Sequence, residues 1–172
     1  FISGSERVRC VYRAGHLGVS LLVVLPVAVA LVLVGRPDLA VLGELCVLSV
    51  ASLPDVDHEL PLVSHRGVTH TIWFALLVGF GFGAVGWVLG GRPTTPVAPE
   101  LAVAGFGFGT LGVCAHLLGD VLTPMGIRPL WPLSGRAITL DLVRAKNPLA
   151  NYALLALGVA GTVAALLAVT PP

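Results

Sequence analysis

The chain has 172 residues, of which 56% are hydrophobic and only 11% are charged, and its mean hydropathy is +0.94. A soluble domain carries about 25% charged residues and cannot hide this much apolar surface in an ordinary core, so we expect the chain to lie in a lipid bilayer. The net charge of +1, with no basic run and no acidic tail, argues against a nucleic acid partner.

Residues 1–172 suit one domain, and five apolar stretches approach the roughly 20 residues that a membrane helix needs. The expected helices cover residues 16–34, 39–53, 69–91, 98–119 and 148–170. Basic residues precede the first helix, as they precede a signal peptide. However, the 18 uncharged residues from Leu17 to Val34 exceed a usual signal core of about 7–15, and no small-residue cleavage site follows. We expect this helix to be retained in the membrane.

The second stretch is short and carries Glu44, so it is either a full span or a re-entrant helix. The third and fourth stretches are rich in glycine, which allows close helix contact inside a bilayer. The connection over 121–147 contains several Pro and Gly residues and reads as a loop, with Trp131 as an interfacial anchor. The expected fold class is all-α, a polytopic membrane helical bundle.

Lysine and arginine placement predicts the orientation, because cytoplasmic loops are enriched in these residues. If all five stretches span and the N-terminus is cytoplasmic, eight basic residues are inside: Arg7, Arg9, Arg13, Arg66, Arg128, Arg136, Arg144 and Lys146. Only Arg36 and Arg92 are then outside. We therefore expect a multi-pass protein of the inner or plasma membrane with its N-terminus in the cytoplasm and its C-terminus outside.

The same topology gathers all the histidines, with several aspartates, at the cytoplasmic ends of the helices. These residues are His16, Asp55, Asp57, His58, His65, His70, His116 and Asp120. If the segment after Pro54 is extended, Asp55 and Asp57 point the same way, and His116 and Asp120 share a helix face because they are four residues apart. Simpler roles stay open: Asp55 could cap a turn, and His65 beside Arg66 could be a solvated loop pair.

Imidazole and carboxylate ligands together suit a divalent transition metal, zinc first, with manganese or iron(II) as alternatives. A set of this size could hold one ion or two. A two-metal site can activate water and clamp both oxygens of a phosphoryl displacement.

Three strings in this order carry a family resemblance: Pro54-Asp55-x-Asp57-His58, His65-Arg66-Gly67-x-Thr69-His70-Thr71, and His116-x-x-x-Asp120-x-x-Thr123-x-x-Gly126. Together with His16 before Gly18, they resemble the YdjM-like family of predicted inner-membrane, metal-dependent hydrolases over residues 13–150. The chain departs from the family at Thr71, where serine is common. The resemblance implies a multi-pass fold and a metal site at the matching positions.

We therefore expect a membrane-bound hydrolase of an ester or phosphoester, with a lipid-like substrate at the cytoplasmic surface. The expected metal ligands are His16, Asp57, His58, His70, His116 and Asp120. Asp55 and His65 are expected in catalysis as base or orienting groups, and Arg66 in binding an anionic phosphate. Two alternatives stay open: a transition-metal transporter or sensor, and a structural protein in which the metal staples the helices together. The sequence does not predict the oligomeric state.

Overall fold

The computed structural model describes residues 4–59, 66–92 and 95–169, although not the side chains of residues 4–12, 58, 59, 92, 95, 96 and 169. In these ranges the chain is helical apart from one two-residue strand pair, its turns and the connection before the last helix. Five segments are long and apolar enough to cross a membrane. The expected all-α membrane bundle is therefore confirmed.

Five long helices form the bundle, with short 3-10 helices (η) and strands between them. The elements in chain order are α1 (Gly4–Leu33), α2 (Pro37–Val50), η1 (Pro54–Glu59), η2 (Val68–His70), α3 (Ile72–Gly90), β1 (Gly91–Arg92), β2 (Thr95–Pro96), α4 (Ala98–Val121) and α5 (Pro148–Val169). β1 and β2 pair in antiparallel fashion between α3 and α4. The predicted loop over 121–147 contains no helix.

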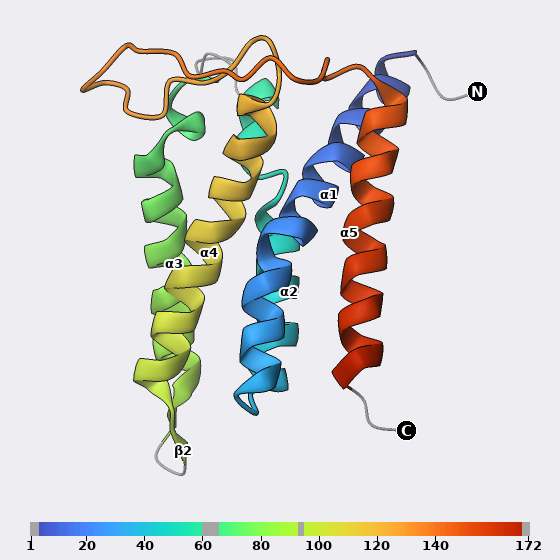
Figure 1. The fold of residues 1–172 in the computed structure, drawn as a ribbon. Coiled ribbons are helices and arrows are strands. Elements are labelled where there is room, and N and C mark those ends of the chain that lie inside the picture. Colours follow the sequence, from blue (N-terminus) through green and yellow to red (C-terminus); the bar gives the residue numbers. More distant parts are fainter. Residues whose placement is uncertain (1–3, 60–65, 93–94, 170–172) are drawn as a thin grey trace.

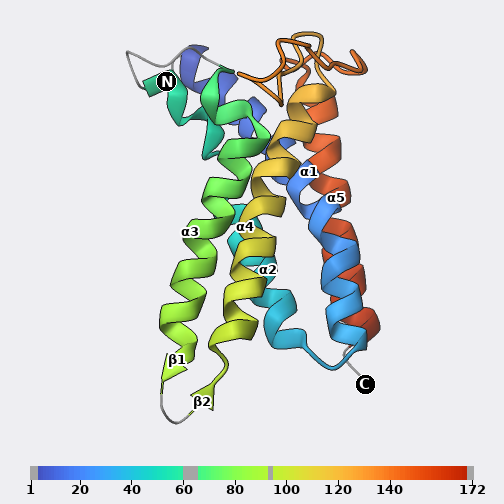
Figure 2. The same ribbon diagram turned by 90° about the vertical axis from the view of Figure 1, so that its left-hand side faces the viewer.

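The helices run roughly parallel or antiparallel in two pairs with α2 packed between them (Figures 1 and 2). One pair is α3 with α4, the other is α1 with α5, and α2 contacts both α1 and α4. Two buried apolar clusters join these elements, one around Val50, Ala75 and Val113 and the other around Val24 and Val47.

Glycine sets the spacing between α3 and α4. A Cβ atom at Gly86 would overlap the carbonyl oxygen of Leu101, and one at Gly105 would lie 2.5 Å from that of Phe82. Backbone cannot move aside as a flexible side chain can, so these positions exclude larger residues. The close approach that the glycine-rich stretches predicted is therefore present.

Two helix boundaries differ from the expectation. α1 begins at Gly4 rather than near residue 16, because a helix can continue past the bilayer once its apolar part ends, and the apolar span itself starts at Arg13. α2 ends at Val50, but a turn and η1 continue in the same direction, so that the apolar span runs from Pro37 to Asp57. The short second stretch thus reaches the same end of the bundle as its neighbours (Figure 1).

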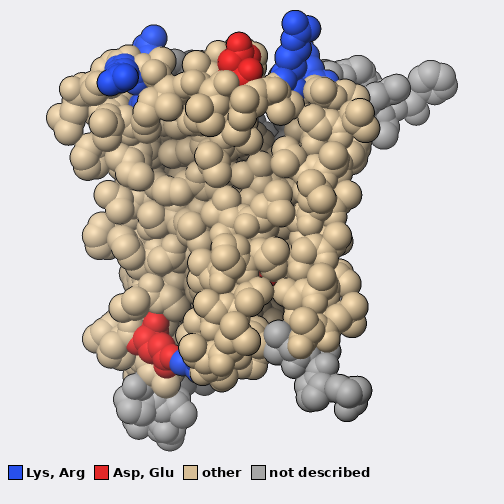
Figure 3. Space-filling model, in the orientation of Figure 1, with Lys and Arg blue, Asp and Glu red and all other residues tan. Residues whose placement is uncertain are grey.

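Charged side chains gather at the two ends of the bundle and leave its flank apolar (Figure 3). At the end opposite the histidines, Arg36 pairs with both Asp38 and Glu100. Glu44 is partly exposed within the span and has no ion pair among the described residues. Cys46 is a buried free thiol and Cys114 a half-buried one, and each packs in an apolar cluster.

Candidate metal centre

Local structure explains how four elements bring polar side chains to one point. His116 and Asp120 lie one turn apart on the same face of α4, as their spacing predicts. Thr71 caps α3, accepting a hydrogen bond from the N–H of Phe74, and so fixes His70 just before the helix begins. η1 supplies Asp55, and α1 supplies His16.

Four donor atoms form a compact group: Nε2 of His70, Nε2 of His116, Oδ1 of Asp55 and Oδ2 of Asp120. The Nε2 atom of His70 lies 3.2 Å from the Asp120 oxygen, 3.7 Å from the Asp55 oxygen and 3.4 Å from the His116 nitrogen. The His116 nitrogen lies 3.6 Å from the Asp55 oxygen and 3.5 Å from the Asp120 oxygen. Ligands around a tetrahedral zinc at 2.0–2.2 Å lie about 3.3–3.6 Å apart. The five distances lie close to this range, and donors on His70, His116 and Asp120 form one group that could hold a metal ion.

Hydrogen bonds on the far side of each ring orient the two imidazoles. Nδ1 of His116 lies 2.7 Å from the carbonyl oxygen of Ala51, which accepts only, so Nδ1 carries the proton and Nε2 is left to bind. Nδ1 of His70 lies 3.3 Å from Oδ2 of Asp57 and 3.0 Å from the hydroxyl of Thr69. Carboxylates and carbonyls that hold a histidine in this way are common behind metal ligands.

Arg66 connects the carboxylates of Asp57 and Asp120 to the surrounding structure. Its guanidinium donates to Oδ1 of Asp120, to the hydroxyl of Thr123 and to the carbonyl oxygen of Gly126. Its backbone N–H donates to Oδ2 of Asp57 at 3.0 Å. Arg66 adopts φ 59°, in the left-handed region that costs a non-glycine residue about 1–2 kcal/mol, so these contacts hold a strained conformation.

The charges of the cluster are unbalanced without a cation. Asp55, Asp57 and Asp120 carry −3 when ionised, and Arg66 contributes +1, so the group has a formal charge of −2 with neutral histidines. Asp57 and Asp120 are almost completely buried. Oδ2 of Asp120 is buried and faces the two Nε2 atoms, with no other polar partner among the described residues. A divalent cation would balance this charge and satisfy the buried oxygen.

In the metal-free protein a proton on His70 supplies part of this balance. Burial alone lowers the pKa of His70, but hydrogen bonds to Asp120 and Asp55 and the charge of Asp57 outweigh it, and the pKa rises to about 9. His70 is therefore a cation at neutral pH until a metal displaces its proton.

His16 lies beside the four donors and not among them. Its ring stacks on that of His116, with centroids 4.0 Å apart, and its Nε2 is 4.0 Å from Oδ1 of Asp120. A donor atom of His16 also comes within 4.8 Å of donors on Asp55 and His116, a second grouping that could hold an ion. A Cβ atom at position 119 would lie 2.6 Å from Nδ1 of His16, so Gly119 is required for this position.

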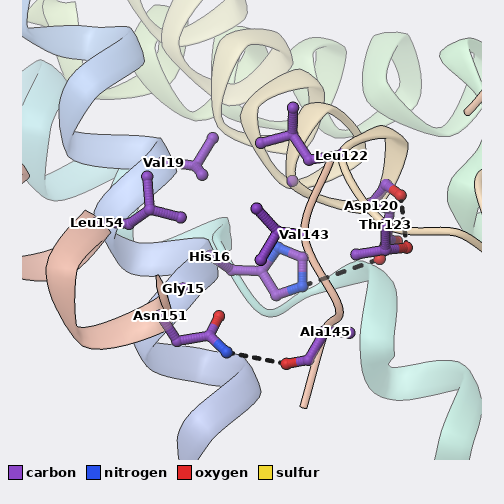
Figure 4. Close-up of a pocket in the computed structure, with 11 residues that line it drawn as sticks. Gly15, His16, Val19, Asp120, Leu122, Thr123, Val143, Ala145, Asn151 and Leu154 are labelled. Atoms are coloured by element: carbon purple, nitrogen blue, oxygen red, sulfur yellow. Dashed lines mark hydrogen bonds and ion pairs between the residues drawn. The ribbon is translucent and has the colours of Figure 1, made fainter. Parts of the chain in front are cut away.

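A cavity of about 30 Å³ adjoins His16 and Asp120 (Figure 4). Its walls include Gly119 and Val143, and Asn151, which donates to the carbonyl oxygen of Ala145. Nδ1 of His16 is buried and has no hydrogen-bond partner in the described part of the chain. The volume suffices for one or two water molecules, and His16 offers one of them a polar partner.

The structure brings together most, but not all, of the residues that the sequence singled out. His16, Asp55, His70, His116 and Asp120 converge, whereas Asp57 lies behind His70. Asp55 and Asp57 point in different directions because η1 is a 3-10 helix, in which residues two apart differ by about 120° around the axis, and not the extended segment that we expected. The side chain of His58 and the whole of His65 lie outside the described residues.

Some contributors carried no usable signal in the sequence. The carbonyl oxygen of Ala51 orients His116 through backbone alone, which any residue could supply. Thr69 donates to Asp57 at 2.9 Å, and its position within the second string was the only indication of this role. Gly119 is one of 21 glycines and could not be distinguished without the position of His16.

Comparison with known proteins shows similarity to inner membrane proteins. The chain is 34% identical over 124 residues to the inner membrane protein YdjM of Escherichia coli strain K12, and equally to that of Shigella flexneri. The alignments cover 61% of this chain and 57% of each relative's length, so the chain spans little more than half of these proteins. No solved structure matches. The profile of the YdjM inner membrane protein family matches residues 13–170, and the chain therefore belongs to this family.

Proposed function

We propose that the protein is a metal-dependent hydrolase of the inner membrane that cleaves an ester or phosphoester at the cytoplasmic surface. One observation carries the proposal: the Nε2 atoms of two buried histidines each lie 3.2–3.7 Å from two carboxylate oxygens at the end of a membrane bundle. The assignment of this end to the cytoplasm follows the basic residues, and the relatives' names support the inner membrane.

In this proposal His70, His116, Asp55 and Asp120 are the metal ligands. A bound divalent metal would polarise the scissile carbonyl or phosphoryl group and lower the pKa of a coordinated water to about 7. Asp57 orients His70 so that its Nε2 faces the other donors, and Arg66 holds Asp120. Both terminal nitrogens of the Arg66 guanidinium donate to protein acceptors. We therefore assign Arg66 to positioning the Asp120 carboxylate rather than to binding a substrate phosphate.

His16 is the candidate for handling protons. Its Nδ1 is buried and free to accept, and it lines the cavity beside Asp120. A water molecule in this cavity would lie within reach of His16, which could then act as the general base that takes its proton. A lipid-like substrate fits the location, because the site residues lie at the ends of the membrane-spanning segments.

Metal content tests the proposal first. The purified protein is measured in detergent by inductively coupled plasma mass spectrometry beside a His116→Ala/Asp120→Ala variant. We expect close to stoichiometric zinc, manganese or iron, lost in the variant. The loaded protein is then assayed on phosphoester and lipid ester substrates. Absence of metal from both proteins, even after reconstitution with these ions, would refute the metal site and with it the hydrolase.

A structural metal staple is the second candidate, and it too has an observation in its favour. Four protein donors are enough to fill the shell of a zinc ion and leave no open position. Cobalt substitution separates the two candidates: an intense four-coordinate visible spectrum unchanged by added anions indicates a staple. A weaker five- or six-coordinate spectrum that shifts with anions indicates an open site. A transporter is less well supported, because Glu44 is the one acid deeper in the described span.

A further inference from the structure

The connection between α4 and α5 has a surface that the site does not use. Residues 125–146 cross the histidine-bearing end of the bundle as a strap, and the orange part projects sideways beyond α3 (Figure 1). Figure 2 places the strap at the same end in the perpendicular view. Its projecting part therefore overhangs the space that lipid occupies around the helices.

The strap is held in place by backbone hydrogen bonds. The N–H of Leu140 donates to the carbonyl oxygen of Val121, and that of Leu142 to the carbonyl oxygen of Leu122. Ile127 and Ile138 form an antiparallel bridge, which closes the projecting part into a loop. Gly126 adopts φ 58° against the carbonyl oxygen of Ile138, an approach that a Cβ atom would block. The strap thus has a defined conformation and is not a random linker.

Most large apolar side chains of the strap are exposed, although Ile127 is buried in the core. Met125 is 72% exposed, Leu133 is 78% exposed and Leu142 is 69% exposed. Other large exposed apolar residues of the strap are Leu130, Trp131, Ile138 and Leu140. A surface of this kind in water would be costly, and a partner of matching polarity is expected.

The charges of the strap are basic. Arg128, Arg136, Arg144 and Lys146 oppose Asp141 alone, which gives a net charge of +3 over residues 125–146. Basic residues beside exposed aliphatic and tryptophan side chains are the composition that binds an anionic membrane surface.

We propose that the strap is an interfacial docking surface for acidic phospholipid headgroups. Its apolar residues enter the upper acyl layer, and its basic residues contact the phosphates. The occupant is the lipid of the protein's own leaflet, because the strap overhangs that leaflet and carries the opposite charge. The proposal does not require the protein to be a hydrolase.

Tryptophan fluorescence tests this directly. Trp73→Phe and Trp87→Phe leave Trp131 as the reporter, and the full chain is reconstituted in nanodiscs of phosphatidylcholine with or without phosphatidylglycerol. We expect blue-shifted emission that brominated lipid quenches most strongly when the bromines are near the headgroup. Bromines placed on phosphatidylglycerol should quench more than the same bromines on phosphatidylcholine, since each basic residue enriches anionic lipid about fivefold at low salt.

A charge variant supplies the matched control. Arg128→Gln, Arg136→Gln, Arg144→Gln and Lys146→Gln together should abolish the preference for phosphatidylglycerol while the blue shift remains. Two results would overturn the proposal. One is emission of Trp131 that aqueous acrylamide quenches freely and brominated lipid does not. The other is a blue shift that depends on two copies in one nanodisc, which would show that a second chain covers the strap. Metal content is unaffected by either result, so the hydrolase proposal is tested separately.

Discussion

The two aspartates of η1 have different contacts, and isosteric substitution separates their roles. Asp57→Asn removes a negative charge behind His70 but keeps an oxygen that can accept from the N–H of Arg66 and the hydroxyl of Thr69. Asp55→Asn instead changes one of the four donors. We expect both variants to weaken metal binding, by different amounts.

The magnitude for Asp57 follows from its position. Removing a carboxylate that orients a ligating histidine typically costs 10–100-fold in metal affinity, or about 1.4–2.8 kcal/mol. The amide oxygen introduced by Asp57→Asn can still accept the proton on Nδ1 of His70, so we expect a loss within this range. Asp55→Asn replaces a charged ligand by a neutral one, and its loss should exceed about 100-fold, the upper end expected for an orienting group.

Affinity is measured in detergent by competition with a chromophoric zinc chelator, with His116→Ala as the control that abolishes a ligand. Thermal unfolding without metal accompanies each variant, because Asp57 is buried and an asparagine there costs stability by itself. The reasoning is refuted if Asp57→Asn abolishes binding in a folded protein while Asp55→Asn retains near-normal affinity. Asp57 would then be the ligand, and η1 would have to rotate.

Three further predictions follow from the same structure. Because the pKa of His70 is raised to about 9, a metal ion must displace a proton from His70 below that pH. Metal affinity measured by the same competition should therefore rise about tenfold per pH unit from 7 to 9 and then level off. A flat profile would show that His70 is not a ligand. Arg66→Lys keeps the charge but cannot bridge Asp120 and Gly126, so we expect about 10–100-fold weaker metal binding with the helices intact by circular dichroism, whereas wild-type affinity would mean that charge alone suffices. Gly86→Ala should destabilise the bundle by about 1–3 kcal/mol in thermal unfolding because its Cβ meets the backbone of Leu101, while Gly81→Ala, which meets nothing within 4 Å, should not; equal effects would contradict the packing of α3 on α4.

The helices could be predicted from the sequence because lipid imposes a simple rule: about 20 apolar residues must satisfy their own backbone. All five stretches are helices or helix-plus-turn spans in the structure, and the ends match within a few residues except at the start of α1. Hydropathy could not predict that start, because a helix that extends into water leaves no apolar signal. Among the described residues, His16, His70 and His116 converge because topology fixes their depth, which the sequence does predict.

The roles of the individual site residues were harder to predict. Whether Asp55 or Asp57 faces the donors depends on the local helix type, and two aspartates in a six-residue segment carry no signal for 3-10 against extended backbone. The role of Arg66 depends on which acceptors lie within reach, and those belong to α4 and the strap, about 60 residues further along the chain. The motifs predict which residue types form the site and at which level of the membrane they lie. Which side of an imidazole a carboxylate occupies depends on tertiary contacts.

Arg66 joins the two surfaces that this structure presents. One arm of its guanidinium holds Asp120 and the other holds the carbonyl oxygen of Gly126, where the strap begins. Thr139 of the strap donates to the carbonyl oxygen of Thr123, whose hydroxyl accepts from the same guanidinium. A displacement of the strap would therefore act on the position of Asp120 through short, directional contacts. Arg66 holds the strap as well as Asp120, which accounts for a strained, largely buried arginine at this position better than charge neutralisation alone, since a lysine could supply the charge.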